Sequence, residues 1–283
     1  MDVSYKVDMV KMRLKIHNNV IQAIFDRTRE DVEQFDYYES RSLKKYRHVW
    51  KVEQPSGATF AVMYRHNMEK PNSHSYYWLA FEYNPQKVEK MGILESLVSM
   101  ATIENPSKVE IVSADIAVDI PVHMDYVRAY RKGKARKLTY EEGNGKTIYF
   151  GMKSSDNYLK IYDKQAERKS KGVQIEVTTR LEVSHKVGKP LTSLASWLPS
   201  DIIHDIYIIP QQVQMVTGEP ITAMYQACLL AVENEEMTIQ QFNRRTGNKI
   251  RELLERKWTR FNINPIDEKS ALMEHVADWY KRK

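Results

Sequence analysis

The stretch "SSDNYLKIYDKQAE", residues 154–167, carries the residues of this chain best suited to chemistry. Because strand side chains alternate between two faces, Tyr158, Lys160, Tyr162 and Lys164 would share one face, opposite two aliphatic residues. A phenol with a pKa of about 10 is a weak nucleophile at neutral pH and needs nearby cations to act as one. The two lysines of this row could supply them. Alternatively, the tyrosines only pack against their cross-strand neighbours.

Acidic side chains line one face of two further predicted strands. In "ADIAVDI", Asp115 and Asp119 alternate with aliphatic residues, and in "QIEVTTRLEV", Glu176 and Glu182 share a face with Arg180. Carboxylates in such strands need partners, and oxygen ligands suit Mg²⁺ or Mn²⁺. We therefore expect a metal on Asp115, Asp119 and Glu182, with Glu176 in reserve. Ion pairing with an arginine is the alternative for each acid.

Other common sites lack their sequence signatures. The single Cys228 excludes an internal disulfide framework and a clustered-thiolate zinc site, and it lies on the apolar stripe of a predicted helix. The eight histidines are scattered, without a His-hydrophobic-His pair. No G-x-x-x-x-G-K-[ST] or G-x-G-x-x-G motif occurs, which argues against ATP hydrolysis and dinucleotide chemistry.

Composition indicates a globular protein whose positive net charge is compatible with a polyanionic partner. The 283 residues include 43 Lys and Arg against 37 Asp and Glu, a net charge of +6. No apolar run approaches the roughly 20 residues that cross a bilayer, and the charged N-terminus is unlike a signal peptide. We expect a cytoplasmic protein with no membrane partner.

The strand and helix patterns predict an α+β fold with a large antiparallel or mixed sheet. Residues 1–214 would form one α+β domain, in halves of about 1–106 and 107–214 that have the same order of elements and could be duplicated. Predicted strands cover 10–17, 48–53, 59–66, 75–83, 108–120, 136–142, 146–151, 158–163 and 173–186. Predicted helices cover 18–35 and 85–101.

From about residue 215 the pattern becomes helical, so residues 215–283 form a predicted C-terminal helical region. Within residues 238–261, Ile250, Leu253, Leu254 and Trp258 recur at helical spacing and would face inward. The basic residues left on the outer face are candidates for DNA binding, although a solvated helix face is the alternative. They are Arg244, Arg245, Lys249, Arg256, Lys257 and Arg260.

Three segments together, "SADIAVDI", "TIYFGMKSSDNYLKIYDKQAE" and "TTRLEVSHK", resemble the plasmid rolling-circle replication initiators of the replication initiation factor family. That family is related to a class of conjugative relaxases. The resemblance covers residues 107–186. Its core is a glycine, a serine and an aromatic-basic strand ending in Tyr162, Asp163, Lys164 and Glu167. Lys160 departs from the arginine that relatives often carry there, and loses a bidentate fork on phosphate.

The resemblance implies that residues 1–214 are a nicking domain. Tyr162 would nick one strand of the plasmid's double-strand origin and become joined to the 5′ phosphate, assisted by Lys160, Lys164 and Mg²⁺ or Mn²⁺. Tyr158 is the competing nucleophile. The implied partners are duplex and single-stranded origin DNA, a host helicase and a second copy of the chain. A conjugative relaxase of the same chemistry and a non-enzymatic DNA-binding protein are the alternative functions.

Overall fold

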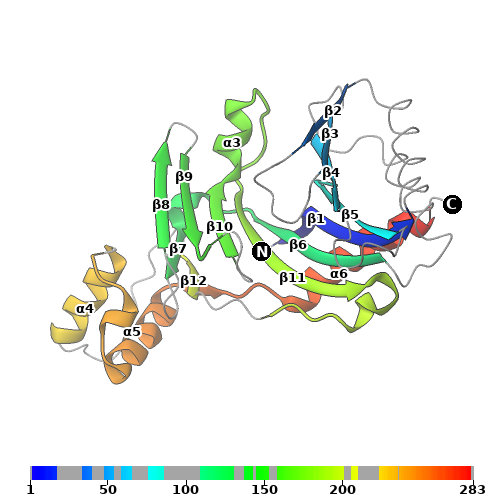
Figure 1. Ribbon diagram of the computed structural model, residues 1–283. Coiled ribbons are helices and arrows are strands. Elements are labelled where there is room, and N and C mark those ends of the chain that lie inside the picture. The colour runs from blue at the N-terminus through cyan, green and yellow to red at the C-terminus, as the bar shows by residue number, and fades with distance from the viewer. Residues whose placement is uncertain are drawn as a thin grey trace. The chain divides into compact units, whose positions relative to one another are not determined.

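Figure 1 shows a computed structural model of the chain. The structure describes residues 2–17, 34–39, 48–53, 59–65, 76–85, 109–130, 137–142, 145–152, 158–200, 205–209, 223–234 and 236–281. The chain divides into two compact units, each assembled from segments distant in sequence. The first unit comprises Met1–Ser4, Val118–Val183 and Ser200–Asn264, and the second comprises Tyr5–Ala117, Ser184–Pro199 and Pro265–Lys283.

The second unit is a sheet accompanied by helices η3 (Leu191–Ser196) and α6 (Pro265–Lys281). Its strands lie in the order β2 (Gln34–Glu39), β3 (His48–Glu53), β4 (Thr59–Arg65), β5 (Tyr76–Tyr83), β1 (Ser4–His17), β6 (Val109–Ile120) and β11 (Thr179–Pro190). Pairing is antiparallel from β2 to β5 and between β5 and β1. A buried contact of 2.9 Å between His185 Nε2 and Glu268 Oε1 ties α6 to β11.

The first unit contains the last residues of β6 and the first residues of β11, with β10 (Tyr158–Asp163), β9 (Gly145–Phe150) and β8 (Lys137–Glu142) next in strand order. A second sheet has the order β13 (Thr259–Phe261), β12 (Asp205–Ile208) and β7 (Val127–Tyr130). The helices of this unit are η2 (Met124–Tyr126), α3 (Lys164–Ser170), α4 (Ala223–Glu233), η4 (Ile239–Gln241) and α5 (Arg244–Lys257).

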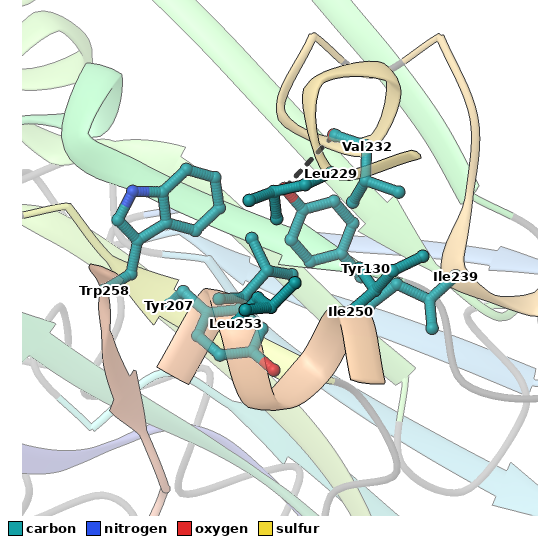
Figure 2. Packing of buried hydrophobic residues seen from close by; sticks show 9 residues of the cluster. Tyr130, Tyr207, Leu229, Val232, Ile239, Ile250, Leu253 and Trp258 are labelled. Atoms are coloured by element: carbon teal, nitrogen blue, oxygen red, sulfur yellow. Dashed lines mark hydrogen bonds between the residues drawn. The ribbon is translucent and has the colours of Figure 1, made fainter. Parts of the chain in front are cut away.

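A hydrophobic cluster joins α4, η4 and α5 to the three-stranded sheet (Figure 2). Tyr130 and Tyr207 from the sheet meet buried residues of both helices, and the Tyr130 hydroxyl donates to the carbonyl of Val232 at 3.3 Å. Gly247 permits the close approach of α5 to η4, since a Cβ there would lie 3.2 Å from the carbonyl oxygen of Ile239. The half-buried Cys228 packs against the same cluster.

The predicted α+β class and helical C-terminal region are confirmed. The predicted helix over 18–35 falls outside the described residues except for its last two positions, which begin β2, and the helix over 85–101 falls outside them except for its first residue. The boundaries of the two units differ from the predicted domains 1–214 and 215–283, because 200–264 and 265–283 belong to different units. None of the described helices is both long and apolar enough to cross a membrane.

The predicted strand over 173–186 is wrong in its first part, because β11 begins only at Thr179. Two carbonyls of the preceding segment are used by the start of α3 instead of a sheet ladder. The backbone N–H of Lys164 donates to the carbonyl of Thr178 at 2.9 Å, and the side chain of Gln165 donates to that of Ile175 at 3.2 Å.

Candidate active site

Strand β10 presents the predicted row of tyrosine and lysine side chains. Leu159 and Ile161 are fully buried, whereas Tyr158 and Lys160 are half-buried on the opposite face. The predicted alternation is therefore confirmed for residues 158–162, but Lys164, predicted in the same strand row, begins helix α3 instead. Tyr162 ends the row and is only 5% exposed, so its hydroxyl must find partners within the protein.

The hydroxyl of Tyr162 lies between a carboxylate and a lysine ammonium group. It donates a hydrogen bond of 2.5 Å to Glu182 Oε1 on β11, and it accepts one of 3.2 Å from Lys164 Nζ. The phenol proton therefore points at a carboxylate, while an amine approaches the same oxygen. This arrangement brings together three of the residues singled out in the sequence.

Lys160 contacts the ring of Tyr162 rather than its hydroxyl. Its Nζ lies 3.9 Å from the ring centroid and 3.2 Å from Glu182 Oε2. A cation over a ring face is attracted by the ring's electron density. Lys160 therefore holds the ring and the second oxygen of Glu182 in place.

Burial raises the pKa of Tyr162 well above its usual value of 10.0, and the adjacent carboxylate of Glu182 raises it further. Arg180 acts in the opposite direction but does not offset these effects. At neutral pH Tyr162 is thus a neutral phenol. Attack by this oxygen would require a group that takes its proton, and Glu182 is the carboxylate that already receives the hydrogen bond.

Helix α3 holds Lys164 through a carboxylate one turn away. Lys164 Nζ lies 2.5 Å from Glu167 Oε2, and Lys171 Nζ lies 2.6 Å from Glu167 Oε1. Burial would raise the pKa of Glu167, but the hydrogen bonds and charges of the two lysines outweigh it and bring the pKa to about 2. The pKa of Lys164 is lowered, chiefly by burial. The Asp163 side chain caps the helix by accepting from Ala166 N at 2.8 Å.

Two of the three acids predicted to bind metal, Asp119 and Glu182, are engaged with cations of the protein. Asp119 accepts two hydrogen bonds, of 2.5 and 2.7 Å, from the guanidinium of Arg180. Glu182 is held by Tyr162 and Lys160. Asp115 is half-buried in the part of β6 that belongs to the second unit.

The reserve ligand Glu176 lies in the segment before β11 and not on a strand. Among the residues that the structure describes, no group of three or more His, Cys, Asp or Glu is arranged to hold a metal ion. The residues as placed therefore do not fit a ready-made metal centre.

The sequence does not single out two residues that act on this site. Arg180, expected only as a partner for acids, lowers the pKa of Tyr162, and Lys171 pairs with Glu167. The signal for Lys171 is its spacing, because Glu167 lies three residues after Lys164 and four before Lys171, which places all three on one helical face.

Tyr158, the competing tyrosine, has a different environment from Tyr162. Its ring stacks on that of Tyr149 of β9, with centroids 6.1 Å apart and an interplanar angle of 26°. The carboxylate of Glu182 and the amine of Lys164 thus contact Tyr162, whereas Tyr158 belongs to an aromatic row.

Helix α5 buries Ile250, Leu253 and Leu254 as predicted, and Trp258 is buried directly after it. The helix predicted over 238–261 ends at Lys257, so five of the six predicted cations lie on α5 and Arg260 lies on β13; the six fall into two groups. Arg244 and Arg245 are exposed in the first turn of α5 and form no ion pair with any residue that the structure describes. The other four predicted cations are paired. The pairs are Lys249 with Glu252, Arg256 with Glu252, Lys257 with Glu233, and Arg260 with Asp205 and Glu255.

A chain with a mixed α+β fold and a buried tyrosine between a carboxylate and a lysine is consistent with the resemblance predicted from residues 107–186. Residues 123–211 match the model of the family described as replication initiation factor, so this segment is similar to that family. The matched segment contains Tyr162, Lys164 and Glu182 and ends before α4.

Curated relatives point in the same direction. One replication initiation protein of Staphylococcus aureus is 26% identical over 182 residues, covering 61% of this chain and 53% of its own length. Another from the same organism is 25% identical over 213 residues, covering 71% of this chain and 62% of its own length. The chain thus spans little more than half the length of the first relative. A solved rolling circle replication initiator protein from Geobacillus stearothermophilus aligns at 18% identity and a TM-score of 0.40, over 69% of this chain and 78% of that one.

Proposed function

We propose that this protein initiates rolling-circle replication of a plasmid by nicking one strand at the origin through Tyr162. The observation that carries the proposal is the 2.5 Å hydrogen bond from the Tyr162 hydroxyl to Glu182, with Lys164 Nζ at 3.2 Å from the same oxygen. The family match over residues 123–211 and the names of the curated relatives support replication initiation as the process.

In the proposed reaction, the phenol proton passes to the Glu182 carboxylate as the Tyr162 oxygen attacks the scissile phosphorus. A bond forms between the tyrosine oxygen and phosphorus, and the bond from phosphorus to the 3′ oxygen breaks. The 5′ phosphate remains on Tyr162, and the departing 3′ oxygen takes a proton from solvent. One phosphate ester replaces another, so the reaction consumes no nucleotide and the reverse step rejoins the strand.

Lysine side chains would assist this exchange electrostatically. Lys164 Nζ, which already donates to the phenol oxygen, would stabilise the negative charge that develops there. Lys160 would hold the ring through its position over the ring face and its bond to Glu182. Arg180, fixed by Asp119, would add positive charge to the same region.

A requirement for Mg²⁺ or Mn²⁺ remains part of the proposal, as the resemblance implies. Such an ion would stabilise charge on the phosphate oxygens. Because the described acids do not form a metal-holding group, the steps above use only side chains of the chain itself. With Glu182 proposed as the proton acceptor, Asp115 and Asp119 remain the proposed metal ligands.

The remaining partners follow from this activity. The helical region of α4 and α5 would bind duplex origin DNA, and the sheet face around Tyr162 would bind the strand to be cut. Nicking does not separate strands, so the protein would need a host helicase. Both would act in the cytoplasm. The proposed assembly state is a homodimer. A conjugative relaxase would use the same site.

The test is a covalent adduct. Incubating the protein with supercoiled plasmid DNA and Mn²⁺, followed by a denaturing gel, should give a protein-DNA species whose phosphorylated peptide contains Tyr162. Tyr158→Phe should still form the adduct. Origin binding without any adduct would leave a DNA-binding protein and exclude the nicking reaction.

A further inference from the structure

Three tyrosines from three neighbouring strands form a row of ring contacts. The rings of Tyr140 on β8 and Tyr149 on β9 meet edge to face, with centroids 5.6 Å apart. Tyr149 stacks in turn on Tyr158 of β10, with centroids 6.1 Å apart. We call Tyr140, Tyr149 and Tyr158 the tyrosine ladder. Figure 1 shows the three strands side by side.

The strand register places the tyrosine ladder on the same sheet face as Tyr162. Thr147 of β9 is paired with Tyr162 on one side and with Tyr140 on the other. Directly paired residues of antiparallel strands point to one face, so Tyr140 and Tyr162 share it. In the adjacent row Tyr149 is paired with Lys160, which contacts the Tyr162 ring.

The two faces of these strands differ in character. The opposite face carries the core residues Ile148, Phe150, Leu159 and Ile161, all at most 1% exposed. The ladder face is open: Tyr140 is 51% exposed, and Tyr149 and Tyr158 are half-buried. Packing within the core does not require an aromatic ring at a half-exposed position of β8, which is the last strand of its sheet.

We propose that the tyrosine ladder is a stacking platform for unpaired bases of the DNA strand that Tyr162 cuts. This inference rests on the proposed function, because it takes that strand as the ligand. The phosphate must reach the hydroxyl of Tyr162, a residue that is only 5% exposed, and a paired and stacked duplex would hinder this approach. Bases released from pairing expose their flat faces, and aromatic side chains bind them with little dependence on sequence.

The dimensions of the ladder suit a short single strand. Tyr158 and Tyr162 are four residues apart on one strand, a distance of about 13 Å at about 3.3 Å per residue. Across the sheet, β8 and β10 are about 10 Å apart, at about 4.8 Å per strand. Each path accommodates about three or four bases at about 3.4 Å each. A strand whose phosphate lies at Tyr162 would thus place its neighbouring bases on the ladder.

The test uses the whole 283-residue chain and a short fluorescein-labelled single-stranded oligonucleotide of mixed sequence, with binding followed by fluorescence anisotropy. Tyr140→Ala should weaken binding by roughly 5- to 150-fold, as loss of one stacked base predicts. Tyr140→Phe, which keeps the ring, should stay within about twofold of the parent chain. Thr139→Ala, an exposed neighbour on the opposite face, is the matched control. When the same oligonucleotide is presented as a duplex, the affinities of Tyr140→Ala and the parent chain should differ far less.

Equal oligonucleotide affinity of the parent chain and Tyr140→Ala would overturn the platform, as would an equal loss in Thr139→Ala. A second measurement does not depend on the folding of the alanine variant. Ultraviolet crosslinking of the parent chain to a 5-iodouracil oligonucleotide should modify peptides that contain the ladder. Crosslinks confined to other segments would also overturn it. The adduct gel is independent, because nicking by Tyr162 can succeed with the platform disproved, and oligonucleotide stacking can succeed where no adduct forms.

Discussion

Around Tyr162, charged side chains converge on one buried phenol, whereas on α5 most charged side chains pair with one another at the surface. Glu182 and Lys164 both contact the Tyr162 oxygen, and Lys160 covers its ring. On α5, Glu252 alone pairs with two cations of the same helix, one in the preceding turn and one in the following turn. Buried pairs set the position and protonation of a group, while exposed pairs contribute little and are easily exchanged for a phosphate.

This difference predicts that substitutions near Tyr162 change the chemistry and those on α5 change only affinity. Tyr162→Phe is the strongest test of the prediction that substitutions near Tyr162 change the chemistry. It removes the attacking oxygen and no carbon, so adduct formation and nicking should fall below detection while origin binding stays nearly intact. Adduct gels and gel-shift assays measure the two properties. An active Tyr162→Phe with an inactive Tyr158→Phe would reverse the assignment of the nucleophile.

Removal of divalent metal should have the next largest effect. Excess EDTA should abolish nicking, and Mg²⁺ or Mn²⁺ should restore it, because the proposed ion would stabilise charge on the phosphate oxygens. Asp115→Asn and Asp119→Asn, which keep shape but lose charge, should each lower the rate sharply. Full nicking in excess EDTA would remove the metal from the mechanism.

Glu182→Gln separates a proton acceptor from a metal ligand. Loss of the acceptor should slow nicking by roughly 10²- to 10⁴-fold. The pKa of Tyr162 should fall, because Glu182 helps to raise it, so the variant should recover as pH rises, by up to about tenfold per pH unit. The parent chain should show a shallower dependence. Rescue of the variant by excess Mn²⁺ at constant pH would instead indicate that Glu182 is a metal ligand.

The smallest effects should come from α5 and should differ between its two groups of cations. Arg244→Ala with Arg245→Ala should weaken duplex binding and flatten its salt dependence by about two units of slope, since these cations are exposed and unpaired among the described residues. Lys249→Ala with Arg256→Ala should change the slope by less, because both already pair with Glu252. Cleavage of a single-stranded oligonucleotide should be nearly normal in both. Equal slopes for both double variants and the parent would leave α5 an ordinary solvated helix.

Periodicity predicted which side chains share a face, but not what they touch. The strand pattern of 158–163 placed Tyr162 and Lys160 together, and the helical pattern buried Ile250 and Leu253, as the structure has them. Local spacing cannot report a partner such as Glu182, which is 20 residues from Tyr162 in sequence. The same limit applies to the three acids expected to bind metal. The pairing of Asp119 with Arg180 spans 61 residues and cannot be read from local spacing.

The only cysteine of the chain lies half-buried on α4, against the cluster that joins the two helices to the three-stranded sheet. A thiol reagent therefore modifies this protein at one place. Because Cys228 is partly covered by the cluster, its rate of modification reports how accessible this side of α4 is. Following that rate with and without duplex DNA would show whether bound DNA covers or exposes the helical region, without an introduced label.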